Sequence, residues 1–202
     1  MAGQKCGVMI MIVVTLAFCL GSVIYTTGYY PGGYSWPGLG SRQNPLPVNV
    51  TITYSPSSTT FGLINAYHPT SFDGYTMKVT LLEVIKGDEA DKKLAEQGRN
   101  PDYWGYDGLM AKFRVEILED RIKSKVMAMG PSDFKVTDNA GIIYSPDYIF
   151  YKPGFSADNL DAGDIVEGWV VIKYYNDQPP ALIVFDHSST DSVGLWFKTA
   201  ER

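Results

Sequence analysis

Short runs in which apolar and polar residues alternate recur through most of this chain, and they constrain its fold more than any other feature. In the clearest run, residues 110–118, Ala111, Phe113, Val115 and Ile117 fall on one side and charged residues on the other. A period of two places successive side chains on opposite faces of a strand. One face of this strand is therefore expected to be buried while the other meets solvent, as is typical of antiparallel sheets.

Similar segments follow one another along the chain with hardly a helix between them. The other expected strands are 48–54, 61–67, 75–85, 126–129, 134–137, 141–144, 165–175, 181–185 and 194–198. Residues 88–97 are polar and helix-permissive, so they predict a short helix or an inserted loop, and residues 99–108 predict a loop. Many short strands at regular spacing predict an all-β fold, an immunoglobulin-like antiparallel β-sandwich.

The N-terminal end has a different character. No charged residue lies between Lys5 and Arg42, and residues 6–25 form an almost unbroken apolar run. About 20 apolar residues are enough to cross a bilayer as a helix, and the positive charge ahead of the run predicts a cytoplasmic N-terminus. Two interpretations remain open. A retained anchor predicts a membrane-anchored protein with its C-terminal domain outside the cytoplasm, whereas cleavage beside Cys19 or Gly21 predicts a secreted protein.

The expected domain organisation follows from these two patterns. Residues 1–25 are a signal peptide or membrane anchor, residues 26–47 are a linker rich in Gly, Pro and Tyr, and residues 48–202 are the β-sandwich. Both cysteines, Cys6 and Cys19, lie in the apolar run, so the exported part contains no disulfide. The formal net charge is −5 and no basic block occurs, which argues against a nucleic-acid partner.

Three stretches carry a resemblance to a known family. They are 111–118, 132–146 (SDFKVTDNAGIIYSP) and 159–172 (NLDAGDIVEGWVVI). From residue 74 to residue 202 the chain resembles the telokin-like, immunoglobulin-fold domain of unknown function found on exported bacterial and archaeal proteins, which is similar in fold to the mycobacterial immunoprotective extracellular protein. The resemblance implies a sandwich without shared catalytic residues. The segment 87–108 is longer than the usual connection in that family.

Two groups of aromatic residues in expected loops are the candidate binding residues. One consists of Tyr103, Trp104 and Tyr106, and the other contains Tyr148 and Tyr151. Aromatic rings on loops can stack on sugar rings or form the centre of a protein interface. The alternative is that they cover the edges or ends of the sandwich.

Several polar residues are candidates for a metal, glycosylation or catalytic site. Asp158, Asp161 and Asp164 resemble a loose calcium loop, although turn chemistry explains the same residues. Asn49 begins the sequon Asn-Val-Thr and is a glycosylation candidate. His187 has serine and aspartate neighbours in one polar loop, but a catalytic triad usually converges from separate parts of a fold. We therefore expect no catalytic residue, no metal site and no cofactor, and hence no enzyme.

The expected function is that of an exported, non-catalytic domain at the cell surface, used for binding or surface structure. Its expected partners are the membrane, through residues 6–25 if they are retained, and other copies of itself, surface proteins or glycans. One alternative is a filament subunit that donates strand 48–54 to a neighbour's sheet. The other is binding of glycans or cell wall through the loop aromatics.

Overall fold

The computed structural model describes the greater part of the chain. The described residues are 24–25, for which only the backbone is placed, and 39–55, 72, 74–98, 106–120, 127–145, 151–175, 177, 179–185 and 194–199. The predicted strand 61–67 and the apolar run up to residue 23 lie outside them. Among the described residues, no helix has the length and apolar character needed to cross a membrane.

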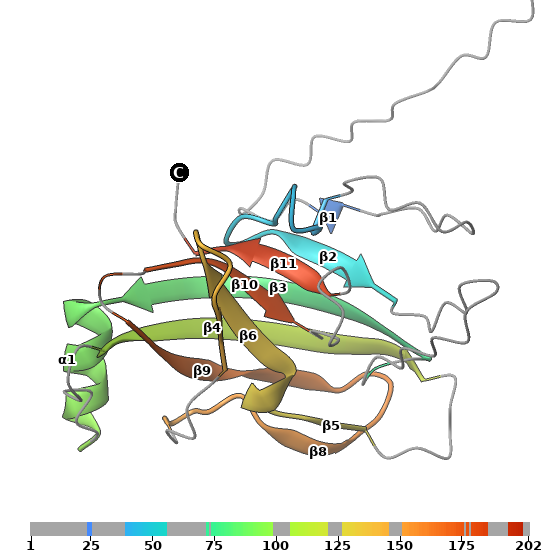
Figure 1. Cartoon of the computed structure of the whole chain (residues 1–202). Helices are drawn as coiled ribbons and strands as arrows, with labels where there is room; N and C mark the ends of the chain where they lie inside the picture. The colour runs from blue at the N-terminus through green and yellow to red at the C-terminus, as the bar shows by residue number, and fades with distance from the viewer. Residues whose placement is uncertain are drawn as a thin grey trace, which may run out of the picture.

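The larger sheet, sheet A, has five strands, and its long strands are those that the alternation predicted (Figure 1). In spatial order they are β1 (Ile24–Tyr25), β2 (Thr51–Tyr54), β3 (Tyr75–Lys86), β4 (Tyr106–Asp120) and β9 (Ile165–Tyr175). The pairing of β1 with β2 is parallel, and every other pairing in the sheet is antiparallel.

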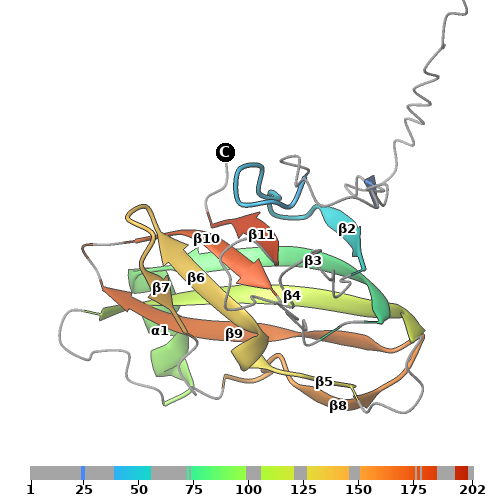
Figure 2. The same cartoon turned by 45° about the vertical axis from the view of Figure 1, so that its right-hand side comes forward.

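The smaller sheet, sheet B, lies across sheet A and makes the second layer of a sandwich (Figure 2). Its order is β11 (Leu195–Lys198), β10 (Pro180–Phe185), β6 (Phe134–Asp138) and β7 (Ile143–Tyr144), all antiparallel. The predicted hairpin between 134 and 144 is confirmed as β6 and β7. A further pair, β5 (Met127–Met129) and β8 (Ala157–Leu160), extends one end of the molecule, and the short 3₁₀ helix Pro131–Asp133 precedes β6.

The core fills the space between the two sheets. Ala111, Phe113, Val115 and Ile117 are all fully buried, so the predicted inner face of β4 is confirmed. Phe113 of sheet A packs against two rings of sheet B. Its ring centroid lies 4.5 Å from that of Phe134 and 5.3 Å from that of Phe197. Aromatic contacts between the layers therefore fix how sheet B sits on sheet A.

One helix covers part of the outer face of sheet A. Residues 88–97 do form a helix, α1 (Asp88–Glu96), which lies at one end of β3 and β4 (Figure 1). Ala90 and Leu94 are buried in a small second core with Ile85 and Met110. The carboxylate of Asp91 accepts a hydrogen bond from the Gly108 backbone N–H at 2.9 Å. The inserted segment therefore becomes part of the domain through its own apolar face.

Beyond the helix, the outer face of sheet A is polar. Lys78 and Glu116 form an ion pair at 3.2 Å, and Lys112 and Glu167 form another at 2.7 Å. Exposed pairs of this kind contribute only about 0–1 kcal/mol each to stability. These charged side chains keep the outer face of sheet A exposed to solvent. The stability of the fold therefore comes mainly from the buried core.

The segment before β2 is packed into the domain, although the sequence places residues up to 47 in a linker. Leu46 is fully buried and pairs in parallel with Phe197 at the edge of sheet B. The Asn49 backbone then takes a φ of 63°, and its N–H bonds to the carbonyl of Leu81 on β3. This left-handed residue interrupts the alternation that began at residue 48, so β2 starts only at residue 51. One continuous segment thus contacts the edges of both sheets.

Candidate functional site

The candidate residues from the sequence divide into those that the structure describes and those that it does not. Tyr103, Trp104 and Tyr148 lie outside the described residues, as does His187. The described candidates are Tyr106, Tyr151, Asn49, Asp158, Asp161 and Asp164.

Tyr106 is the first residue of β4 rather than part of a loop, and there it joins two other tyrosines. The antiparallel register sets it directly opposite Tyr175, the last residue of β9. The two ring centroids are 4.5 Å apart, and the ring of Tyr144 on β7 lies 6.0 Å from that of Tyr175 in an edge-on arrangement. A hydrogen bond with the Tyr175 side chain raises the pKa of Tyr106. Three strands from two sheets therefore bring three tyrosines together.

Apolar side chains adjoin this cluster in the chain. Ile142 and Ile143, the two residues before Tyr144, are 43% and 41% exposed, and Tyr175 is 45% exposed. Of the three rings, that of Tyr175 is exposed and that of Tyr144 is buried, and the Ile143 side chain lies on the opposite face of β7 from Tyr144. Isolated exposed apolar residues are normal, but two exposed isoleucines beside β7 and an exposed ring at the end of β9 in one region make it a candidate interaction surface. We call Tyr106, Tyr144, Tyr175, Ile142 and Ile143 the tyrosine patch.

Carboxylates give this patch a negative character. The Tyr144 hydroxyl donates to the carboxylate of Asp138 at 3.4 Å, and that carboxylate also accepts the Ile142 backbone N–H at 2.8 Å. Burial raises the pKa of Tyr144, and the nearby charges of Asp138 and Asp177 raise it further. Because both carboxylates act on the same hydroxyl, they lie on the patch side of the molecule.

Tyr151 lies in a different place and is engaged in packing. Its ring meets Trp169 of β9 edge-on at 6.1 Å, and the ammonium of Lys93 on α1 lies 5.9 Å from the centroid of Trp169. The side chain of Gln97 exchanges two hydrogen bonds with the backbone of Lys152, at 2.9 and 3.0 Å. We call these five residues the helix-side cluster. They fasten the chain around residue 152 to the end of α1.

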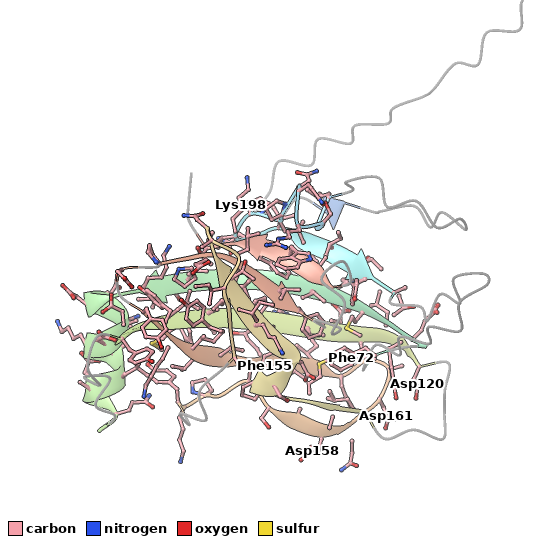
Figure 3. All side chains as sticks on the ribbon, in the orientation of Figure 1. Phe72, Asp120, Phe155, Asp158, Asp161 and Lys198 are labelled. Atoms are coloured by element: carbon pink, nitrogen blue, oxygen red, sulfur yellow. The ribbon has the colours of Figure 1, made fainter. Side chains whose placement is uncertain are left out.

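The three aspartates do not form a calcium loop. Asp158 is on β8, and Asp161 follows that strand (Figure 3). The carboxylate of Asp164 accepts the backbone N–H of Asp161 at 2.8 Å, within a turn. In the described part of the chain, no group of three or more ligating side chains could hold a metal ion. Turn chemistry accounts for the spacing of the aspartates, because an Asp carboxylate readily bonds to the backbone of its own turn.

Asn49 is exposed, so its sequon lies at the surface of the domain. Its left-handed backbone is common for asparagine in turns, whose short polar side chain tolerates that conformation. This conformational role explains the residue whether or not it is modified.

The sequence left several patch residues unmarked. The alternation and turn signals place Tyr144, Tyr175, Ile142 and Ile143 in expected strands or turns without distinguishing them as binding residues. The useful signal was that the expected strand 165–175 ends in two tyrosines while strand 141–144 also ends in one. Only the register of β4 with β9 brings these ends to Tyr106.

Comparisons with known proteins find no matching family, and they find structural similarity at low sequence identity. No protein-family model matches the chain, and no curated protein matches it. Among solved structures, the secreted protein MPT63 of Mycobacterium tuberculosis overlaps 76% of this chain and 97% of its own length, with 12% identity and a TM-score of 0.48. YjhA of Bacillus subtilis overlaps 77% of this chain and 99% of its own length, with 13% identity and a TM-score of 0.40.

A third structure, YcdA of Bacillus subtilis, is named as a candidate lipoprotein. It overlaps 67% of this chain and 39% of its own length, with 12% identity and a TM-score of 0.40. At these values the three structures decide neither the family of this chain nor its function.

Proposed function

We propose that this protein is an exported, non-catalytic β-sandwich domain that binds another protein through the tyrosine patch. The observation that carries the proposal is the exposed side chain of Tyr175, whose ring packs at a tilt against Tyr106 and edge-on to Tyr144, the residue that follows the exposed Ile142 and Ile143 in the chain. Tyrosine is enriched at protein interfaces, where it offers a large rigid contact area at low entropic cost.

The sandwich is of the immunoglobulin-like, telokin-like type in this proposal. Strand order supports it. Strands β3, β4 and β9 occupy the places of A, B and E in such a domain, and β11, β10, β6 and β7 those of G, F, C and C′. The chain crosses between the sheets from β4 to β6 and again from β9 to β10, as an immunoglobulin-like sandwich does.

Export is the second element of the proposal, and the N-terminal run supports it. Residues 6–25 are apolar and follow Lys5, which favours a cytoplasmic N-terminus and a domain on the other side of the membrane. The protein is then a membrane-anchored surface domain, or a secreted one if the run is removed.

The chemistry of the patch favours a protein over a glycan. Ile142 and Ile143, which are exposed beside Tyr144 in the chain, suit apolar side chains of a partner. The exposed Asp177, whose charge acts on Tyr144, favours a partner that carries arginine or lysine among its apolar residues, whereas Asp138 is buried and engaged with Tyr144 and Ile142.

The test places a photo-crosslinking phenylalanine analogue at position 175 in intact cells. We expect one heterologous adduct that forms at 175 and disappears when Ile143→Ser is added. The matched control puts the same analogue at Ile165, at the opposite end of β9, which is 51% exposed but outside the patch. Equal labelling at 165 and 175, or none at 175, would contradict the proposal.

Two other outcomes separate the alternatives. An adduct of twice the monomer mass favours self-assembly. Such self-assembly would use the tyrosine patch. It would not need donation of strand 48–54, because β2 would remain paired with β3 in its own sheet. Glycan-array binding that Tyr175→Ala abolishes and Tyr151→Ala does not favours the glycan alternative.

A further inference from the structure

Two residues at the end of the apolar N-terminal run are part of sheet A. Ile24 pairs with Thr51, and Tyr25 pairs with Ile52, in parallel register. Neighbouring strands lie about 4.8 Å apart, so the end of the apolar run and the start of β2 are in direct contact. Figure 1 shows β1 as the outermost strand beside β2.

This pairing changes what the Gly- and Tyr-rich stretch does. The described residues on the two sides of this stretch meet at one edge of sheet A, because β1 pairs with β2. The chain just before β2 is held by Leu46, whose N–H bonds to the carbonyl of Trp196 and whose carbonyl accepts the N–H of Lys198, both at 2.8 Å. Fully extended, residues 26–47 could hold a domain roughly 70 Å from a bilayer. Because Tyr25 and Ile52 are paired in sheet A, the end of the apolar run lies one strand spacing from the domain, and the length of the stretch between them does not increase that separation.

The edge of β2 is suited to pairing with a further strand. An unpaired edge strand presents free N–H and C=O groups, which is a template for pairing with another chain. Two of the other three sheet edges, those at β11 and β9, are covered by neighbouring segments of the chain. Leu46 pairs along β11, and the N–H of Phe155 bonds to the carbonyl of Trp169 on β9 at 2.9 Å. The segment that lies along β2 is β1.

We propose that residues 24–25 of this same chain are the strand that the β2 edge binds, so that the domain is seated at the membrane surface instead of hanging from a tether. The proposal rests on the export proposed above. Residues 6–23 are still enough for an apolar helix of about 27 Å, close to the thickness of the hydrocarbon layer. Tyr25 then lies at the membrane–water interface, where tyrosine is enriched.

The same contact survives processing. Cleavage after Cys19 or Gly21 would leave residues 24–25 in the mature chain. The strand would then be a short N-terminal arm that closes the β2 edge of a secreted domain.

A disulfide scan tests the docking. Full-length protein with Cys6→Ser and Cys19→Ser receives Ile24→Cys and Thr51→Cys, which face each other in the register. Cα atoms at strand spacing are within disulfide range. We expect an intramolecular disulfide on mild oxidation, in detergent and in membranes, with most of the protein cross-linked and monomeric.

The matched control pairs Ile24→Cys with Glu167→Cys. Glu167 continues the row that runs from Thr51 through Thr80 and Arg114, but it lies three strands beyond Thr51, roughly 14 Å away. This pair should stay reduced. A disulfide-linked dimer of the 24/51 variant would show that the edge takes this segment from a second copy, and an absent disulfide would show that β1 does not dock. Either result overturns the proposal.

A second measurement covers a cysteine variant that fails to fold. A photo-crosslinking residue at position 24 should give an adduct with residues 51–54 of the same chain, mapped by mass spectrometry; an adduct elsewhere contradicts docking. Export is scored separately, by labelling the reduced Thr51→Cys variant in intact cells with a membrane-impermeant maleimide. Loss of that labelling with the disulfide retained would refute export alone.

Discussion

The tyrosine patch and the helix-side cluster are both aromatic, and both contain a tyrosine that the sequence marked as a binding candidate, yet they differ in what surrounds the rings. In the helix-side cluster, the ring of Tyr151 packs on Trp169, and Lys93 of α1 and Gln97 just after it hold the site together. In the tyrosine patch, Tyr175 keeps nearly half of its surface exposed. An aromatic residue in a connecting segment is thus part of the fold where neighbours enclose its ring, and available for binding where they do not.

The largest expected effect concerns the backbone beneath the helix-side cluster. A Cβ on Gly168 would lie within 2.4 Å of the Gly154 carbonyl oxygen, a contact that only a backbone shift can relieve. Gly168→Ala should lower the free energy of unfolding by about 3 kcal/mol and detach the chain around Gly154 from β9. The matched control is Gly130→Ala, because a Cβ there meets nothing within 4 Å and the φ of −157° suits any residue. Urea denaturation of both variants checks the difference, and equal stabilities would contradict the close approach.

The next effect separates the two clusters directly. Trp169→Ala should cost about 2 kcal/mol of unfolding free energy, because it removes a partly buried ring that Tyr151 and Lys93 contact. Tyr175→Ala should cost less than about 1 kcal/mol while abolishing the partner adduct formed by a photo-crosslinking residue placed at Ile142, which is 43% exposed in the same patch. Thermal unfolding and partner crosslinking are measured on both proteins. If Tyr175→Ala is the more destabilising, the patch is part of the fold and not a binding surface.

The smallest effect sharpens the contrast within one strand. Tyr174 is only 3% exposed, next to the exposed Tyr175, and burial together with the charges of Asp107 and Asp91 raises its pKa to about 12. In the unfolded chain a tyrosine loses its proton near pH 10. The stability that the neutral hydroxyl contributes is therefore present below pH 10 and lost as pH rises from 10 towards 12.

Tyr174→Phe should reduce that alkaline loss by about 1 kcal/mol, since one pKa unit corresponds to about 1.4 kcal/mol and residual solvent contact weakens the effect. The measurement is unfolding free energy against pH from 7 to 12. Between pH 7 and 9 the curves of the two proteins should run parallel. An unchanged slope above pH 10 would show that Tyr174 ionises in the folded state as it does in water.

Much of the fold follows from local pattern. The alternation at 110–118 and 75–85 predicted β4 and β3 with their buried faces, and the turn Asp138–Gly141 predicted the hairpin, because period-two burial and turn chemistry are encoded in neighbouring residues. The start of β2 was misplaced because Asn49 alternates correctly in sequence but adopts a left-handed backbone. β8 was missed because two of its four residues, Asp158 and Asn159, disfavour strands.

The candidate site was less predictable for a different reason. Tyr106, Tyr144 and Tyr175 are far apart in the chain, and only strand register brings them together. Register depends on long-range pairing that alternation does not encode. The spacing of Asp158, Asp161 and Asp164 suggested a metal site because a calcium loop and an aspartate turn use the same residues, and only the hydrogen bond from Asp161 to Asp164 distinguishes them.

The pairing of Leu46 with Phe197 also restricts the order in which the domain can fold while it is being synthesised. Leu46 is made early and Phe197 late, so the first part of the domain to emerge must wait for the last strand before it can dock. Contacts between such distant residues slow folding, because the loop between them must close before they form. Until β11 arrives, the β10 edge of sheet B is uncovered. The growing chain is thus most vulnerable to proteolysis and misassembly just before its synthesis is complete.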